Sequence, residues 1–174
     1  MRRIVVVGTS GSGKTALARR LTERLGYPHI ELDALNWNAN WTNVPIETFR
    51  GRVVRALDAD EWVVDGNYAK VRDIVWTRAD TIVWLDYSLP LILWRLVRRT
   101  FGRVATGEEL WAGNRESVRI LFSRDSIVLW ALQTYRPLRR TYAAIPGNPT
   151  WAHLTLVRLR SPRECTAWLA RLTG

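Results

Sequence analysis

Five short apolar runs alternate along the chain with stretches in which apolar residues recur every third or fourth position. Short runs that are rich in β-branched residues are typical of strands buried on both faces of a parallel sheet. Strands that alternate with helices predict an α/β fold, with helices on both faces of the sheet. The predicted strands are 3–7, 29–32, 62–64, 81–85 and 154–159.

The predicted helices lie between these runs. Leu17, Leu21 and Leu25 recur every fourth residue, and Gly26 follows them as a C-cap. A four-residue spacing also marks a helix that begins near Pro45. Further helices are predicted over 89–101, over 115–144 with a bend near 123–126, and over 162–172.

The segment 102–114 is polar, contains glycine and has no clear periodicity. Such a segment between two helices favours a mobile lid. At 174 residues, the chain suits one domain with one sizeable core. We therefore predict a single domain over 1–174, with a lid over 99–124.

The residues between the first strand and the first helix, 8–15, read Gly-Thr-Ser-Gly-Ser-Gly-Lys-Thr. The glycines allow backbone N–H groups to point at phosphate oxygens, while the helix N-terminus adds the positive end of its dipole. Lys14 is expected to reach the β- and γ-phosphates of a nucleoside triphosphate, and the Thr15 hydroxyl to ligate Mg²⁺. A glycine-rich turn that matches by chance is the alternative, and the order of strand, loop and helix disfavours it.

This loop predicts ATP and Mg²⁺ as the cofactors. Base selection in this architecture lies in the lid and in the loop after the last strand, which begins here at Arg160. The residues expected to contact ATP are Gly8, Ser10, Gly11, Ser12, Gly13, Lys14, Thr15, Ala16 and Arg160.

Aspartates follow the second and third predicted strands, at the edge where parallel sheets bind their ligands. Asp65 is placed to hold Mg²⁺ together with Thr15, directly or through water, and its alternative is a cap on the following helix. Asp33 is a candidate for accepting the proton of an attacking hydroxyl, or for holding that hydroxyl in line with the γ-phosphate. Its alternative is a turn residue. Three aromatic residues close by in sequence suit stacking on a ring or sugar, namely Trp37, Trp41 and Tyr68.

The net charge of +10 is carried almost wholly by arginine, which binds phosphate in a planar, bidentate manner. Such an excess fits a site that surrounds a triphosphate, a nucleic-acid partner, or the composition of a genome biased to G and C. The sequence has no helix-turn-helix, zinc-finger or aromatic ribonucleoprotein motif, which disfavours nucleic acid.

Arginines on either side of the predicted lid are candidates for stabilising transition-state charge when the lid closes. For any single one of them, a solvated helical face is the alternative reading. The set comprises Arg95, Arg98 and Arg99 before the lid, and Arg115, Arg119 and Arg124 after it. The residues predicted to act in catalysis are Lys14, Asp33, Arg95, Arg99, Arg115 and Arg124.

Cysteine and histidine are scarce. Cys165 is the single cysteine, which excludes an internal disulfide, and His29 and His153 are too few and too far apart in sequence to indicate a zinc site. The N-terminal apolar run is too short for a signal peptide, and charged residues interrupt the apolar stretch 81–97. We expect a cytoplasmic protein without a membrane span, either a monomer or a homodimer.

With these motifs placed, the sequence resembles the adenylate-kinase-like P-loop proteins. It looks most like the bacterial subgroup of topology modulation (FlaR-like) or adenylate kinase-related proteins. The resemblance covers nearly the whole chain, including Asp-Thr-Ile-Val-Trp-Leu-Asp at 80–86 and Leu-Trp-Ala-Gly-Asn-Arg-Glu-Ser at 110–117. It implies a three-layer fold with a five-stranded parallel sheet, a Mg-ATP donor, an arginine-bearing lid, and an acceptor-binding segment that we place at 33–60.

The chain also departs from the adenylate kinase pattern. Those enzymes carry Asp-Gly-Phe-Pro-Arg after the third strand, where the arginine grips the acceptor phosphate, whereas this chain has Asp-Gly-Asn-Tyr-Ala at 65–69. The missing arginine argues against AMP as the acceptor. The loop is also similar to that of shikimate and gluconate kinases, in which an aspartate after the second strand contacts the acceptor hydroxyl, and this similarity supports Asp33.

The leading hypothesis is a phosphotransferase that moves the γ-phosphoryl group of Mg-ATP to a small acceptor. The acceptor is left open between a nucleoside monophosphate, a nucleoside and a hydroxylated metabolite. A nucleotide-dependent regulator that binds nucleic acid is the second hypothesis, motivated by the net charge. An ATPase with water as the only acceptor is the third.

Overall fold

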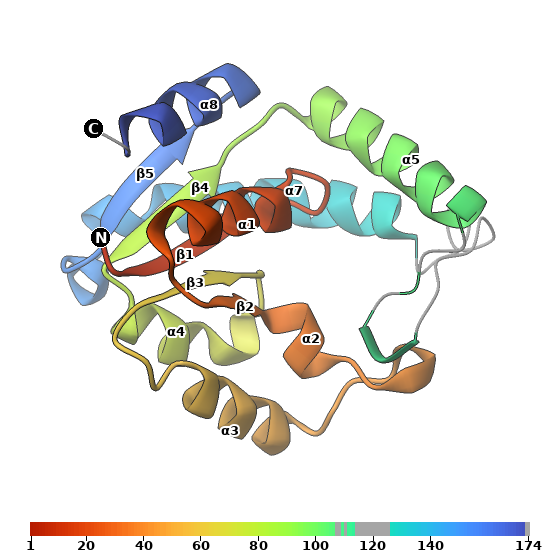
Figure 1. Ribbon diagram of the computed structural model, residues 1–174. Helices are drawn as coiled ribbons and strands as arrows, with labels where there is room; N and C mark the ends of the chain where they lie inside the picture. Colours follow the sequence, from red (N-terminus) through yellow and green to blue (C-terminus); the bar gives the residue numbers. More distant parts are fainter. Residues whose placement is uncertain (107–108, 110, 114–125, 173–174) are drawn as a thin grey trace.

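The computed structural model describes residues 1–106, 109, 111–113 and 126–172 (Figure 1). All five predicted strands are present, and they form one parallel sheet in the order β2-β3-β1-β4-β5. The α/β prediction is therefore confirmed. The strands are β1 (Arg3–Gly8), β2 (His29–Glu31), β3 (Trp62–Asp65), β4 (Thr81–Leu85) and β5 (Thr155–Leu159).

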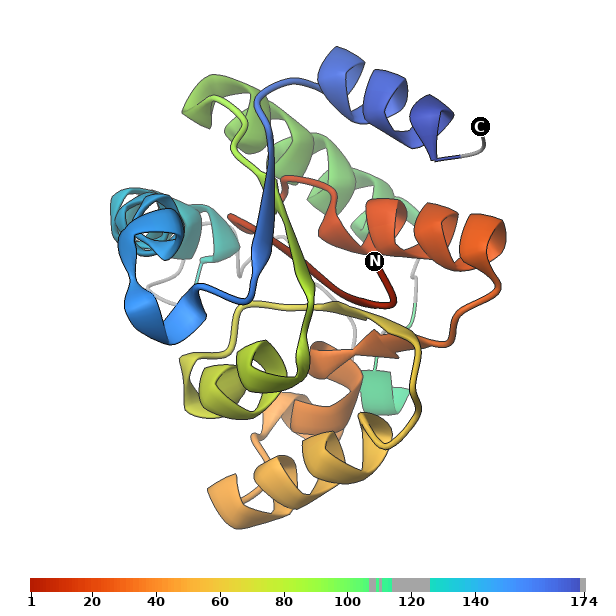
Figure 2. The ribbon, with the colours of Figure 1, turned by 90° about the vertical axis from the view of Figure 1, so that its left-hand side faces the viewer.

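Helices cover both faces of this sheet (Figure 2). The α-helices are α1 (Lys14–Leu25), α2 (Leu32–Asn36), α3 (Ile46–Ala56), α4 (Arg72–Arg78), α5 (Leu89–Thr106), α7 (Ile127–Ala143) and α8 (Pro162–Arg171). Short 3₁₀ turns are η1 (Ala39–Trp41), η2 (Ala69–Val71), η3 (Trp111–Gly113), η4 (Ile145–Gly147) and η5 (Pro149–Trp151).

The apolar run of β1 is continuous because both of its faces are buried. Ile4 and Val6 pack into a core with residues of α1, α5 and α8, while Val5 and Val7 pack into a second core with residues of α3 and α4. Side chains alternate between the faces of a strand, so a strand between two helical layers needs apolar residues at every position. Helix α1 completes its layer with Leu17 and Leu21, and ends at Gly26 in the left-handed conformation, as predicted.

Several predicted boundaries need correction. The run 29–32 stops being a strand at Glu31, because Leu32 begins α2, and the runs 62–64 and 3–7 each extend one residue further, to Asp65 and Gly8. The last strand begins at Thr155 rather than at residue 154, and the last helix ends at Arg171. Helices α2 and α4 were not predicted individually, because five and seven residues are too few to establish a helical period.

The segment 102–114 was expected to be non-helical throughout, but α5 continues to Thr106. A glycine inside a helix costs about 1 kcal/mol, and the burial of Ile92 and Leu96 on the preceding turns offsets that cost. Helix α7 begins at Ile127, with the Ser126 side chain accepting from the Val128 N–H at 3.2 Å. The earlier part of the helix predicted over 115–144, and most of the predicted lid, lie outside the described residues.

A buried carboxylate ties the end of β4 to β5 and α7. Asp86 is 7% exposed, and its Oδ2 accepts from Arg158 Nε at 2.9 Å and from Arg158 Nη2 at 2.6 Å. Its Oδ1 lies 2.7 Å from Nε of Arg139 on α7. The Arg158 guanidinium also lies over the ring of Trp84, 4.6 Å from its centroid. This ion pair network fixes the arrangement of three elements at the carboxyl edge of the sheet.

Replacing Asp86 with alanine should lower the free energy of unfolding by about 2 kcal/mol, because charge-assisted hydrogen bonds are lost. The loss stays below that of a fully buried pair, since the Arg139 and Arg158 side chains are 44% and 36% exposed and regain water. Chemical denaturation measures the change. Asp60→Ala is the control, because Asp60 pairs with Arg3 at the surface with its side chain 81% exposed. An equal loss in both variants would contradict this account.

Across the described part of the chain, helices long and apolar enough to span a bilayer are absent.

Candidate active site

The loop from Gly8 to Thr15 leaves β1 and enters α1 directly. Gly11 and Gly13 have φ angles of 84° and 95°, which favour glycine, and Gly13 is the N-cap of α1. A Cβ on Gly11 would stand 2.5 Å from Cγ of Leu96, so the close approach of α5 also requires glycine there. The first N–H groups of a helix have no partner within it. The loop therefore presents the start of α1 as an anion site, as a phosphate chain requires.

Lys14 begins α1 and lies half-buried among charged groups. Its Nζ donates to the Thr9 carbonyl at 3.4 Å. Burial lowers the pKa of Lys14, the carboxylates of Asp33 and Asp65 act in the opposite direction, and the guanidinium of Arg99 lowers it further. The charges of both predicted carboxylates and of one predicted lid arginine thus act on this ammonium.

Thr15 in the first turn of α1 contacts Asp65 at the end of β3. The Thr15 hydroxyl donates to Asp65 Oδ2 at 2.5 Å, and Asp65 is 4% exposed at the end of β3. The turn after β3 has Tyr68 as its N-cap, so the alternative reading of Asp65 as a helix cap does not describe this structure. Two hard oxygen ligands at the foot of a phosphate loop fit Mg²⁺, which usually takes one or two protein oxygens and completes its shell with phosphate and water.

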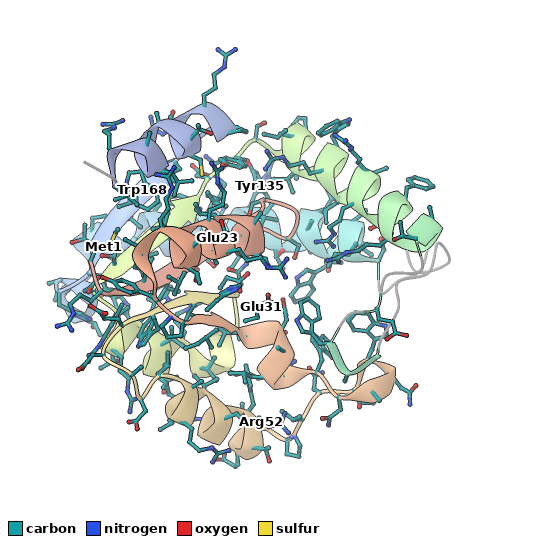
Figure 3. The ribbon with its side chains drawn as sticks, in the orientation of Figure 1. Met1, Glu23, Glu31, Arg52, Tyr135 and Trp168 are labelled. Atoms are coloured by element: carbon teal, nitrogen blue, oxygen red, sulfur yellow. The ribbon has the colours of Figure 1, made fainter. Side chains whose placement is uncertain are left out.

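His29 is a neighbour of this pair that the sequence did not reveal. Its Nε2 lies 3.1 Å from Asp65 Oδ1, and its Nδ1 lies 3.7 Å from Oε1 of Glu31. Glu31 and Asp65 are register partners on β2 and β3, and Figure 3 shows Glu31 between α1 and α2. The imidazole therefore bridges two carboxylates at the carboxyl edge of the sheet. Within the described residues there is no group of three or more His, Cys, Asp or Glu side chains suited to hold a metal by themselves.

Asp33 lies in the first turn of α2 and not in a simple turn. The hydroxyl of Tyr68 donates to Asp33 Oδ1 at 2.5 Å, and accepts from Asn36 Nδ2 at 3.4 Å. Burial raises the pKa of Asp33, while the Tyr68 hydrogen bond and Lys14 lower it. The charges of Asp65 and Glu31 raise it further. The carboxylate is thus held in place through one oxygen and is more basic than an ordinary aspartate.

Asn67 contacts the phosphate loop from the turn after β3. Its Oδ1 accepts from the Gly8 N–H at 3.3 Å, its Nδ2 donates to the Gly8 carbonyl, and Tyr142 on α7 donates to the same Oδ1 at 3.0 Å. The side-chain amide therefore continues the hydrogen bonding of β3 to β1 beyond the last backbone register pair, Val6 with Asp65. The sequence marks Asn67 only as a departure from the adenylate kinase pattern.

Replacing Asn67 with alanine should weaken ATP binding about tenfold, because Gly8 loses both of its amide contacts where the loop begins. Binding is measured by calorimetry with the non-hydrolysed analogue AMP-PNP and Mg²⁺. Tyr142→Phe removes the supporting hydroxyl but keeps the Asn67–Gly8 pair, so its effect should be smaller. Equal affinity in Asn67→Ala and the parent protein would show that the loop holds its shape without the amide.

The predicted arginines have different surroundings. Arg95 Nη1 donates to the Ser12 carbonyl at 3.0 Å, and its guanidinium lies 5.2 Å from the centroid of the Tyr87 ring. Arg95 thus supports the loop backbone, while Arg99, one turn further along α5, lowers the pKa of Lys14.

Arg98 and Arg160 are the other predicted arginines within the described residues. Arg98 lies over the exposed ring of Trp94, 5.4 Å from its centroid. Arg160 has an exposed side chain at the end of β5. Arg115, Arg119 and Arg124 lie outside the described residues.

A phosphate loop after the first strand of a five-stranded parallel sheet, with helices on both faces, gives the chain a P-loop kinase fold. Over 99% of its length it superposes on 93% of the crystal structure of a gluconokinase from Sinorhizobium meliloti 1021, with a TM-score of 0.54 and 24% identity. That likeness is one of fold.

Sequence relatives are also kinases by name. The chain is 30% identical over 116 residues to a protein of Thermococcus kodakarensis named "Putative adenylate kinase", a match that covers 63% of each chain. It is 27% identical over 135 residues to the shikimate kinase of Synechococcus elongatus, which covers 65% of this chain and 70% of the relative. The chain thus spans less than two thirds of the archaeal relative that it matches. No family model matches the sequence.

Proposed function

We propose that the protein transfers the γ-phosphoryl group of ATP to a hydroxyl group of a small acceptor. The observation that carries this proposal is the pair of carboxylates at the phosphate loop: Asp65 accepts from the Thr15 hydroxyl at 2.5 Å, and Asp33, held by Tyr68, acts on the pKa of Lys14. The cation of the phosphate loop is therefore subject to the charges of both a candidate base and a candidate metal ligand. Kinase names among the sequence relatives support the same class of reaction.

In the proposed reaction, the γ-phosphoryl group passes directly from ATP to the acceptor oxygen. The acceptor oxygen forms a bond to the γ-phosphorus, the bond from that phosphorus to the β–γ bridging oxygen breaks, and ADP leaves with the electron pair. The acceptor proton passes to Asp33, whose Oδ2 is available because Tyr68 engages Oδ1. Lys14 and the N–H groups at the start of α1 hold the phosphates, and Arg99 adds positive charge where the γ-phosphoryl group transfers.

Thr15 and Asp65 are the residues that would hold Mg²⁺. When bound, the ion supplies charge neutralisation at the β- and γ-phosphates. His29 orients Asp65 by its contact with Oδ1, which leaves Oδ2 directed at Thr15.

The remaining sequence predictions belong to the same proposal. They are a single kinase-like domain over 1–174, an acceptor segment at 33–60, a lid at 99–124, and phosphate contacts from Arg95, Arg115 and Arg124. Arg160 is proposed to lie near the ATP base, because it follows β5 at the carboxyl edge of the sheet. Membership of the topology modulation subgroup and a cytoplasmic location also remain predictions from the sequence.

The experiment that tests this function is ADP formation from Mg-ATP by the purified protein, alone and with nucleoside monophosphates, nucleosides and hydroxylated metabolites. We expect one class of acceptor to raise the rate above that of the protein alone. A steady rate that no acceptor changes would instead favour an ATPase. ATP binding without turnover, combined with DNA binding that weakens steeply with salt, would favour the nucleic-acid hypothesis.

A further inference from the structure

The surroundings of Asp33 carry information about the acceptor itself. Tyr68 holds the Asp33 carboxylate, Asn36 donates to the Tyr68 hydroxyl, and Asn36 also donates to Asn43 Oδ1 at 2.5 Å. Tyr68 packs edge-on against Phe49 of α3, with ring centroids 5.1 Å apart. A carboxylate, a phenol and amides on a rigid aromatic support are groups that bind hydroxyls by hydrogen bonds.

Tryptophans gather beside these polar groups. Trp37 at the end of α2 and Trp41 of η1 pack edge to face, with ring centroids 5.5 Å apart. Trp111 of η3 donates its indole N–H to Glu31 Oε2 at 3.0 Å, and η3 lies against both α2 and η1. Three half-buried indoles thus lie on neighbouring elements, and indole rings offer apolar faces on which a ring compound can stack.

The backbone is strained where these tryptophans meet. Asn40, Trp41 and Ala112 are the non-glycine residues with positive φ in the described chain, at 58°, 52° and 57°, and all three lie in η1 or η3. Strained conformations cluster at binding sites because the surrounding structure must hold them in place. Because all three lie where η1 meets η3, we take the surrounding structure to hold the tryptophans in fixed positions.

The charged side chains around Asp33 already have partners, because Glu31 pairs with Arg19 of α1 at 3.1 Å and Lys14 lowers the pKa of Asp33. Glu31 and Asp65 contact the same imidazole of His29, and Asp33 follows Glu31 by two residues. Two of the three arginines of α3 have described partners: Arg50 pairs with Asp73 at 2.7 Å, and Arg52, which Figure 3 shows on α3, donates to the Leu35 carbonyl of α2 at 3.1 Å. Adenylate kinases have a phenylalanine at the position of Asn67, and the arginine that binds the acceptor phosphate follows two positions later. This chain lacks that arginine, and the Asn67 amide bonds to Gly8 instead.

We infer that the acceptor is an uncharged ring compound that carries hydroxyl groups, such as a sugar or a nucleoside, and that Trp37, Trp41 and Trp111 bind its face. This inference rests on the proposed phosphotransferase function. A phosphate or carboxylate on the acceptor would meet the Asp33 carboxylate, while Arg19 and Arg50 are paired with Glu31 and Asp73, and like charges in an interface are disfavoured.

The test compares acceptors in matched pairs that differ by one anionic group: adenosine with AMP, ribose with ribose 5-phosphate, and glucose with glucuronate. In every pair that supports ADP formation, the uncharged member should have a kcat/KM at least about tenfold higher. Preference for the anionic member would overturn the inference and leave the kinase proposal standing. Absence of stimulation by all six compounds would count against the kinase proposal itself.

A tryptophan variant tests the second part of the inference. Trp41→Ala should raise the KM of the uncharged acceptor about tenfold and leave the affinity for Mg-AMP-PNP unchanged, because stacking concerns the acceptor alone. Trp41→Phe should restore most of the loss. Trp94→Ala is the matched control, since Trp94 is 57% exposed on α5. Thermal unfolding shows whether each variant is folded, and an unchanged acceptor KM in folded Trp41→Ala would overturn the role of the tryptophans.

Discussion

Replacing Lys14 with alanine should lower the rate of ADP formation by about 10²- to 10³-fold, which is the cost of removing one preorganised group that stabilises transition-state charge. Lys14 is the cation of the phosphate loop, and it is half-buried, so its interaction with phosphate is weakened by water less than that of an exposed lysine. The neighbouring Arg99 cannot substitute for it, because Arg99 reaches the site from α5 and not from the start of α1. Steady-state kinetics with Mg-ATP and a responsive acceptor measure the loss.

The chain contains its own control for this experiment. Lys70 is the other lysine in the sequence, and it is exposed on η2. Lys70→Ala removes the same charge from the net total and should leave ADP formation within about twofold of the parent rate, as expected for a surface substitution. If both variants lost activity equally, the effect would come from overall charge and not from the loop.

Replacing Asp33 with asparagine should lower kcat by about 10²- to 10⁴-fold, the usual contribution of a general base. The affinity for Mg-AMP-PNP should stay the same, because Asp33 lies on the acceptor side of Lys14. Asparagine keeps the size of the side chain and can still accept from Tyr68, so the fold of α2 should persist. An unchanged kcat would exclude Asp33 as the base and leave it as a residue that orients the acceptor.

The pH dependence of the reaction follows from the pKa of Asp33. A base must be ionised to work, and burial together with Asp65 and Glu31 raises the pKa of Asp33 above that of an ordinary aspartate, while Tyr68 and Lys14 oppose this shift. Activity should therefore fall on the acid side at a higher pH than an ordinary aspartate would give. Tyr68→Phe removes a hydrogen bond that lowers the pKa of Asp33, so it should move the acid limb to still higher pH.

Much of this fold could be predicted because its signals are local. Ile4 to Val7 must be apolar when both faces of β1 are buried, and the glycines of the loop are required where the backbone adopts positive φ. The topology of such sheets places Asp33 and Asp65 at the same edge as the loop, as the sequence predicted. The Thr15 hydroxyl contacts Asp65, and the charge of Asp33 acts on Lys14.

The missed residues make contacts that no local pattern encodes. Asn67 meets Gly8 from 59 positions away and Tyr142 from 75, and His29 meets Asp65 from 36. A lone asparagine or histidine at a strand end has many alternative roles, and only the folded arrangement selects one. The continuation of α5 beyond Gly102 was missed for a related reason, because packing of the earlier turns outweighs the weak helix propensity of glycine.

The most direct test of the central claim is to follow the γ-phosphoryl group itself by ³¹P NMR, in a mixture of the protein, Mg-ATP and an uncharged acceptor that stimulates ADP formation. We expect the γ-phosphate signal of ATP to disappear as a phosphomonoester signal of the acceptor grows, in equal amount to the ADP formed. Growth of inorganic phosphate alone would contradict this expectation, because the phosphoryl group would then pass to water.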